Sequence, residues 1–335
     1  MAKFRSINPF SKVNDDTGFG TRDNYGGRFI NRDGTFNIRK EGHGFWERFS
    51  LFQSMLNLPL WKFVVVIFSF FIGINVLFTA IYLLLGVDQF VGLMADNRWS
   101  EIKEIYFFST ETFTTVGYGR VNPVGDGANF VASIEAMCGF ISFAMVTGLI
   151  YGRFAKPVSF LVFSEHAVIA PYRNGTGFMF RFASYKDNHT LTDLDIRVNA
   201  ALSLQENGHT VYKFYDLALE RSKIDSLPLN WTVVHPIDEK SPLTGFTEED
   251  IRTADLEIYV LVRGFDDVFS NFVLRRTSYT YKEIQFNKKF VPMYRESVDG
   301  KTTILELHKL NELKVVEPPS STPSLPLGDS AKLKL

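Results

Sequence analysis

Two long apolar stretches interrupt an otherwise polar chain. Between Phe63 and Val87 there is no charged side chain, and between Gly127 and Gly152 the only one is Glu135. Each stretch exceeds the roughly 20 residues that a helix needs to cross a bilayer core. The pattern predicts an outer transmembrane helix over 60–86 and an inner one over 126–155. Two buried helices of a soluble protein are the alternative, which such length without a polar face disfavours.

A different helix is expected just before the first span. Phe45, Phe49, Phe52 and Leu56 fall on one helical face, and Pro59 ends the run. We interpret residues 45–58 as an amphipathic helix lying in the membrane interface. An ordinary amphipathic helix of a globular domain is the alternative, and direct attachment to a transmembrane span favours the interface.

Basic residues set the expected orientation. They are frequent before the first span and recur directly after the second, whereas the loop between the spans holds only Arg98, Lys103 and Arg120. By the positive-inside rule, both termini lie in the cytoplasm.

The loop between the spans contains the most specific motif. An apolar run from Ile105 to Phe113 is too short to cross the membrane, and it leads into Thr115-Val116-Gly117-Tyr118-Gly119. The pattern predicts a re-entrant helix and filter over 101–119, because irregular backbone at membrane depth occurs only along a water- or ion-filled path. Backbone carbonyls of this motif replace the water around a permeant K⁺ ion. Potassium sites are therefore expected at Thr115, Val116, Gly117, Tyr118 and Gly119.

Three charged residues are expected to support this filter. Glu111 precedes it by four residues, and we interpret it as a brace for the filter backbone and Arg120; a solvated carboxylate at the outer mouth is the alternative. Glu135 lies inside the second span, where an idle carboxylate is costly. We expect it to face protein or water, with a partner at the base of the re-entrant helix favoured.

The second half of the chain has the pattern of a β-sandwich. Ile196, Val198 and Ala200 alternate with polar residues, which predicts a strand with one buried face. Further short strands are expected at 178–182, 212–219, 256–262 and 303–307. Many short strands separated by turns favour a sandwich. Thr247 followed by three acidic residues resembles a helix start.

Together these features resemble the inward-rectifier potassium channel family, in particular its bacterial branch. The run from Trp231 to Leu243 (WTVVHPIDEKSPL) looks like the signature of that family's cytoplasmic domain. The resemblance covers roughly residues 45–317. It implies a homotetramer in the plasma membrane (the bacterial inner membrane), with the pore extended by a cytoplasmic immunoglobulin-like domain over 158–317.

The resemblance also implies roles for individual residues. Tyr151 is the implied inner constriction of the pore, and an interfacial aromatic anchor is the alternative role for this residue. The implied positions are the cavity-lining Ala136, Phe140, Phe143 and Thr147, the constriction Tyr151, the cytoplasmic pore loop Val268, Phe269, Ser270 and Asn271, and the contacts to anionic phospholipid Arg48, Arg153 and Lys156.

Some positions depart from the family pattern. Strong rectifiers carry acids where this chain has Phe143 and Arg263, so weak rectification is expected. Arg120 stands where an acid or aromatic residue is common. The residues after Pro157 do not continue the family's phosphoinositide site, which puts activation by that lipid in doubt.

Composition narrows the remaining function classes. A net charge of −1 argues against nucleic-acid binding, and the single cysteine excludes an internal disulfide. Scattered histidines and the absence of a nucleophile–base spacing disfavour an enzyme, and no organic cofactor is expected. Residues 1–44 and 318–335 are expected to be flexible. Two alternatives stay open: a ligand-gated potassium channel whose cytoplasmic domain senses a small molecule, and a membrane-anchored immunoglobulin-like scaffold.

Overall fold

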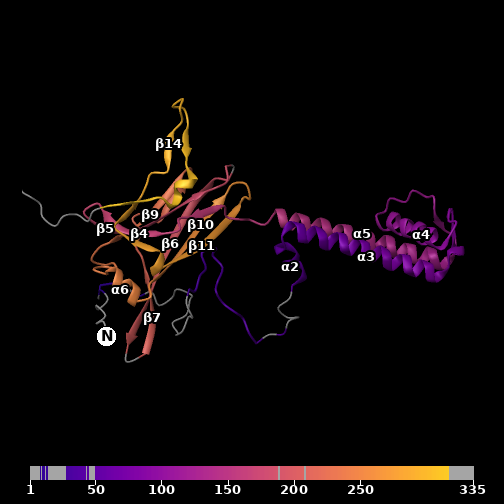
Figure 1. Cartoon of the computed structure of the whole chain (residues 1–335), viewed down its shortest axis with the longest axis horizontal. Helices are drawn as coiled ribbons and strands as arrows, with labels where there is room; N and C mark the ends of the chain where they lie inside the picture. Colours follow the sequence, from indigo (N-terminus) through magenta and orange to yellow (C-terminus); the bar gives the residue numbers. More distant parts are fainter. Residues whose placement is uncertain are drawn as a thin grey trace, which may run out of the picture. The chain divides into compact units, whose positions relative to one another are not determined.

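The computed structural model describes residues 8, 10–11, 13, 28–42, 44, 50–187, 189–206 and 209–316. The chain divides into two compact units (Figure 1). One, the helical unit, is Lys40–Lys156. The other, the β-rich unit, combines Pro157–Leu335 with Met1–Arg39.

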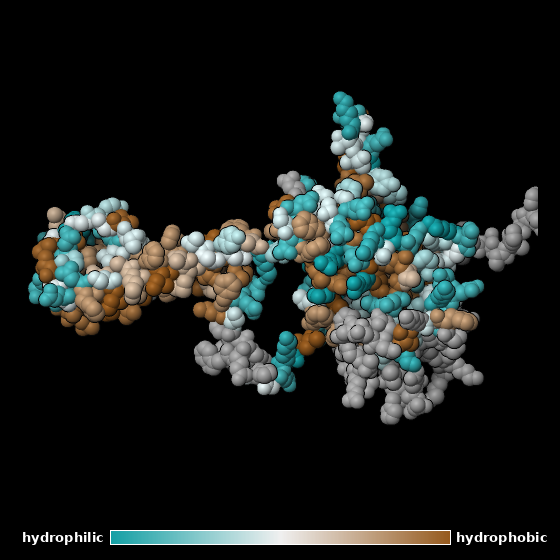
Figure 2. Space-filling view, turned by 180° about the vertical axis from the view of Figure 1, so that it is seen from behind, coloured by the Kyte–Doolittle hydropathy of each residue, from teal (hydrophilic) through white to brown (hydrophobic). Residues whose placement is uncertain are grey.

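The helical unit holds the expected pair of spans. Both α3 and α5 are long and apolar enough to cross a membrane, and hydrophobic side chains cover much of the visible surface of this unit (Figure 2). Its elements are α2 (Leu51–Asn57), α3 (Leu60–Leu85), η1 (Val87–Gln89), β1 (Phe90–Val91), α4 (Arg98–Phe113), β2 (Asn122–Pro123) and α5 (Asp126–Phe154).

Local sequence sets where these helices begin and end. Pro59 precedes the first turn of α3, and Gly86 ends that helix with a φ of +106°, which favours glycine. Asn97 caps α4 by accepting the Ser100 N–H at 2.9 Å, so the re-entrant helix begins three residues earlier than expected. Ser50 caps α2. The first part of the predicted interfacial helix, residues 45–49, lies outside the described residues.

An aromatic cluster packs α4 between the two spans. The rings of Tyr82, Phe90 and Phe108 meet edge to face, with centroids 5.2–5.4 Å apart. Ile105 and Ala128 complete the cluster, and both are fully buried. This packing holds α4 at a fixed place beside α3 and α5.

The β-rich unit confirms the expected sandwich. One sheet has the order β11-β10-β6-β7, with β8 paired to β6; the other has the order β12-β4-β5-β3, with β9 paired to β5. The strands are β3 (Leu161–Phe163), β4 (Ala167–Tyr172), β5 (Gly175–Ser184), β6 (Leu191–Glu206), β7 (His209–Asp216), β8 (Lys223–Ser226), β9 (Asn230–Ile237), β10 (Glu257–Asp266), β11 (Asn271–Thr280) and β12 (Ile284–Phe286).

Shorter elements complete this unit. Thr247 begins α6 with a capping box to Asp250, as the sequence predicts. The hairpin of β14 and β15 projects from the sandwich (Figure 1). The remaining elements are α6 (Glu248–Thr253), η2 (Tyr281–Glu283), β13 (Lys288–Phe290), β14 (Tyr294–Glu296), β15 (Thr303–Leu305), η3 (Leu307–Asn311) and β16 (Leu313–Val315).

The core lies between the two sheets. Phe178, Phe180 and Phe182 of β5 face Ile196 and Val198 of β6, and each is at most 3% exposed. Alternate residues of each strand therefore meet in one apolar layer, as expected for packed antiparallel sheets.

Part of the N-terminal segment is docked rather than flexible. Phe29 and Ile30 are buried, and the Phe29 N–H donates to the Glu257 carboxylate at 3.2 Å. Arg28 pairs with Glu283 at 3.0 Å. Burial raises the pKa of Glu257. Expecting all of residues 1–44 to be flexible was therefore wrong for 28–37, because two apolar side chains and a buried carboxylate fix this segment on a face of the β11-β10-β6-β7 sheet.

A buried arginine fastens the C-terminal elements to the sandwich. Arg181 of β5 is 2% exposed and donates to the backbone carbonyls of Leu310 (2.8 Å), Val291 (2.6 Å) and Lys309. Its guanidinium also lies over the Phe290 ring at 4.5 Å. Burial lowers the pKa of Arg181 to about 10, so the side chain is still charged at neutral pH.

Candidate functional site

The backbone after α4 has an unusual alternation. Thr115, Gly117 and Gly119 have φ of +60°, +56° and +80°, whereas the residues between them do not have positive φ. In an ordinary strand, successive carbonyls point to opposite sides. Reversing the sign of φ at every second residue turns them to the same side, and the two glycines adopt such angles without steric cost. A threonine with positive φ is strained, which is typical of functional sites.

The end of α4 holds this segment in place. The carbonyl of Glu111 accepts the N–H groups of Val116 at 2.9 Å and Gly117 at 3.3 Å. Thr115 donates to the carbonyl of Thr112 at 3.0 Å. Glu111 thus contacts the segment through its backbone.

Two side chains of the motif are largely exposed in the single chain. Val116 is 54% exposed and Tyr118 is 80% exposed. Apolar and aromatic side chains at membrane depth are expected to pack against protein or lipid. The segment therefore presents an uncovered surface that a second polypeptide can complete.

The pairing of Arg120 corrects an expectation. Its guanidinium forms an ion pair with Glu104 of α4, whose side chain is 12% exposed, and not with Glu111. Glu104 and Glu111 lie seven residues apart, which puts them about two turns apart on one face of α4. The chain after Gly119 returns along α4, so Arg120 reaches the acid farther from the Thr115–Gly119 segment.

Glu135 joins three helices, and it faces protein as expected. Its carboxylate is fully buried and accepts the Tyr82 hydroxyl of α3 at 2.6 Å and the Ser109 hydroxyl of α4 at 2.5 Å. Asn75 of α3 lies beside the same hydroxyl, with Ser109 Oγ 3.2 Å from its Oδ1. A polar network of this kind fixes the re-entrant helix against both spans.

Gly139 allows α5 to touch the end of the re-entrant helix. A methyl group added at Gly139 would lie 1.9 Å from the Phe113 carbonyl oxygen. In the sequence, Gly139 is a small residue one turn after Glu135, and this spacing is the signal that could have identified the contact. Beside this contact a cavity of about 470 Å³ is lined by Thr115, Phe140 and Phe143, among others.

The predicted cavity and gate residues lie along one face of α5. Phe140, Phe143 and Tyr151 are 69%, 75% and 74% exposed in the single chain. Thr147 is also exposed, and Ala136 is half-buried. Four large or polar side chains at helical spacing therefore form an unpartnered face.

Two predicted lipid contacts have protein partners. Arg153 donates to the Leu58 carbonyl at 2.5 Å and lies 3.4 Å from that of Met55, at the C-terminal end of α2. Lys156 donates to the Asn57 side chain at 2.8 Å. Cations are favourable at a helix C-terminus, so both residues tie α5 to α2. Arg48 lies outside the described residues.

In the β-rich unit, the predicted pore loop joins β10 to β11. Val268 is 57% exposed, and Ser270 has a φ of +48°. His189 and Asp266 lie at the base of this loop and were not identified from the sequence, because the contact joins residues 77 positions apart.

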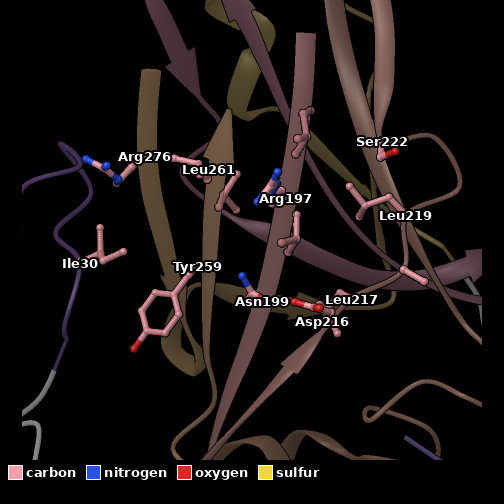
Figure 3. A pocket seen from close by; sticks show the side chains of 14 residues that line it. Ile30, Arg197, Asn199, Asp216, Leu217, Leu219, Ser222, Tyr259, Leu261 and Arg276 are labelled. Carbon is pink, nitrogen blue, oxygen red and sulfur yellow. The ribbon is translucent and has the colours of Figure 1, made fainter. Parts of the chain in front are cut away.

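One face of the same sheet carries several arginines. Figure 3 shows a cleft on this face, of about 580 Å³, lined by Arg197, Arg276 and Leu261 among others. Leu261 pairs with both arginines in the register of the sheet. Arg263 lies two residues along β10, opposite Asp195, and its guanidinium covers the Phe272 ring at 4.1 Å.

Comparison with known families gives two adjoining matches. The model described as "Ion channel" matches residues 63–156. The model described as "Inward rectifier potassium channel C-terminal domain" matches residues 161–327. These ranges correspond to most of the helical unit and most of the β-rich unit.

Individual relatives agree with these matches. The inward rectifier potassium channel Kirbac3.1 of Paramagnetospirillum magnetotacticum is 31% identical over 290 residues, which cover 85% of this chain and 95% of the relative. The ATP-sensitive inward rectifier potassium channel 12 of Bos taurus is 27% identical over 76% of this chain, which spans 64% of that relative's length. A solved structure of the sporulation control protein Spo0M from Bacillus subtilis has a TM-score of 0.22 and 9% identity, covering 37% of this chain and 47% of that chain, and it bears on neither fold nor function.

Proposed function

Because this chain belongs to the inward-rectifier potassium channel family and is a channel rather than an enzyme, we propose that four copies conduct K⁺ through Thr115–Gly119. The alternating positive φ values of this segment carry the proposal, since they turn successive carbonyls toward one side. Four such segments around an axis would form stacked rings of oxygen, the ligands that a hard cation prefers. The exposed Val116 and Tyr118 side chains would then pack against the neighbouring copy.

Reconstitution of the full chain tests this proposal. Liposomes that contain the protein and are loaded with potassium are expected to take up rubidium, a potassium substitute, as potassium leaves down its outward gradient. They are expected to exclude sodium. Cross-linked protein in detergent is expected to migrate with four times the mass of one chain. Equal uptake of sodium and rubidium, or a monomer that conducts, would contradict the proposal.

Membrane placement follows from the same assembly. We place α3 and α5 across the plasma membrane, with both termini in the cytoplasm, on the strength of their apolar length and the flanking basic residues. Anionic phospholipid is the proposed lipid partner. Arg153 and Lys156 already bind the end of α2, so lipid headgroups would act on gating by competing for these two cations.

Weak rectification is the proposed conduction behaviour. Phe143 offers no charge to a polyamine cation in the cavity, and Arg263, Arg197 and Arg276 share one face of the cytoplasmic sheet. Cations of this kind repel a polyamine rather than hold it.

Tyr151 is the proposed inner constriction. Its ring is 74% exposed near the end of α5, and four such rings around an axis are large enough to exclude a hydrated ion. Tyr151→Ala is expected to raise basal rubidium flux several-fold and to reduce the response to anionic lipid. Flux in neutral and anionic liposomes measures both effects.

A neighbouring residue provides the control. Ile150 lies on a different face of α5 at the same depth, so Ile150→Ala should leave basal flux near that of the unaltered protein. If Tyr151→Ala changes flux no more than Ile150→Ala in either lipid, the gate must lie elsewhere, at Phe143 or at residues 268–271.

A further inference from the structure

Two arginines lie side by side in the cleft on the β11-β10-β6-β7 sheet. Leu261 of β10 stands in register between Arg197 of β6 and Arg276 of β11, and all three residues line the cleft (Figure 3). Neighbouring strands are about 4.8 Å apart, so the Cα atoms of the two arginines are separated by about 10 Å. Two long side chains at this separation can contact one small ligand that lies over Leu261.

Neither of these arginines forms an ion pair with another described residue. Arg197 is exposed, and the Arg276 guanidinium lies over the Phe36 ring at 5.2 Å. An aromatic face orients a guanidinium but leaves its N–H groups available as donors. The cleft therefore presents two charged donors whose natural partner is an anion.

The other end of the cleft offers hydrogen-bond acceptors. Asn199 is two residues along β6 from Arg197 on the same face, and Asp216 of β7 lies opposite it in the register. The Asn199 Oδ1 atom is buried and accepts no hydrogen bond from the described residues. Carboxylate and amide oxygens accept hydrogen bonds from hydroxyl groups. A ligand that is anionic at one end and hydroxylated at the other matches both ends of the cleft.

We propose that this cleft binds a small phosphate monoester, with its phosphate between Arg197 and Arg276 and its hydroxyl groups toward Asn199 and Asp216. The forked guanidinium group matches the geometry of phosphate oxygens. The cavity of about 580 Å³ lies in the range of roughly 300–1,000 Å³ that is typical of small-molecule sites.

Phosphate monoesters occur both as free metabolites and as lipid headgroups. The soluble source is favoured, because both candidate membrane spans belong to the helical unit and the cleft lies within the β-rich unit. The ligand is therefore expected to reach the cleft from water rather than from the bilayer.

Occupancy of the cleft changes the charge of this sheet face. Arg263 lies two residues along β10 from Leu261, so a phosphate dianion bound between Arg197 and Arg276 would offset the positive charge of the whole group. This consequence rests on the proposed function, in which these cations repel polyamines and keep rectification weak. A bound phosphate monoester should thus strengthen the block of rubidium flux by internal spermine.

Calorimetric titration of the full chain in detergent with glycerol 3-phosphate measures binding. Low ionic strength is required, because salt screens exposed charges. We expect Arg197→Gln and Arg276→Gln each to weaken binding about tenfold or more, at 1.4 kcal/mol per tenfold. Arg263→Gln is the matched control and should keep most of the affinity, because it removes a cation from the same face but outside the cleft lining.

The variants distinguish a built site from diffuse attraction. An equal loss of affinity in all three variants, or no binding to the unaltered protein, would overturn the site. Arg197 is exposed, so its variant is expected to fold and tests the site even if Arg276→Gln is unstable.

Three probes that share a phosphate group distinguish the sources. Inorganic phosphate should bind more weakly than glycerol 3-phosphate, and Asp216→Ala should reduce that difference, because it removes an acceptor for the hydroxyl groups. Short-chain phosphatidic acid carries the same headgroup with acyl chains. Much tighter binding of this lipid than of glycerol 3-phosphate would overturn the soluble source.

Rubidium flux into liposomes with spermine inside tests the consequence for conduction. Glycerol 3-phosphate on the same side should strengthen the block in the unaltered protein and in Arg263→Gln, but not in Arg197→Gln. If the ester binds and the block does not change, the link to rectification is wrong while the site stands. If the unaltered protein conducts no rubidium, the proposed function fails, whatever the titration shows.

Discussion

Replacing Gly117 or Gly119 with alanine is expected to abolish potassium selectivity and leave most of the fold intact. Both glycines have positive φ, and a side chain in that region costs roughly 1–2 kcal/mol per residue. The methyl group at Gly117 meets nothing within 4 Å, so within one chain the effect comes from backbone angles rather than a clash. In the proposed tetramer, four copies would add this cost around one ion path, and the carbonyls would rotate away from the axis.

The ratio of rubidium to sodium uptake in liposomes measures the loss. We expect it to fall about tenfold or more, which corresponds to about 1.4 kcal/mol. Gly73→Ala in α3 is the matched control, because its methyl group also meets nothing within 4 Å and its φ is ordinary for a helix. Preserved selectivity in both filter variants would refute the assignment of the filter.

Gly139→Ala is expected to disrupt the pore by a different route. Its methyl group would lie 1.9 Å from the Phe113 carbonyl oxygen, far inside the 3.0 Å that such contacts require. Either α5 or the end of α4 must move by more than about 1 Å, and overpacking of this kind typically costs about 1–3 kcal/mol. Phe113 is two residues before Thr115, so the displacement reaches the filter at once.

Conduction and thermal unfolding in detergent together measure this effect. We expect rubidium flux to fall about tenfold or more, at 1.4 kcal/mol per tenfold, together with a lower unfolding temperature. Gly148→Ala, in the same helix but with nothing within 4 Å of the added methyl group, should change neither. Normal flux through Gly139→Ala would mean that α5 and α4 are not in contact in the conducting protein.

Local patterns predicted the main elements of the helical unit. Apolar length identified α3 and α5, because a bilayer imposes a fixed span on any helix that crosses it. The alternate glycines of the Thr115–Gly119 motif predicted its backbone conformation, because glycine permits positive φ at Gly117 and Gly119. Strand alternation and the Thr247 cap were equally local signals, and the structure contains both.

Contacts between distant residues could not be predicted in this way. The pairing of Arg120 with Glu104 depends on how the chain returns past α4, and the docking of Phe29 on Glu257 joins residues 228 positions apart. The contact between His189 and Asp266 was missed for the same reason. No spacing rule relates side chains that a tertiary fold brings together.

Arg181 sets a limit on how far the chain can be shortened from its C-terminal end. Its guanidinium is buried on the outer face of the β12-β4-β5-β3 sheet, beneath the C-terminal elements. The carbonyls that accept its hydrogen bonds belong to Val291, Lys309 and Leu310. A protein cut before Lys309 would keep the cation and lose two of its three acceptors, and an uncompensated buried charge is strongly destabilising. We therefore expect the smallest fragment of the β-rich unit that folds to extend past Leu310, even though both sheets of the sandwich are complete at Phe286.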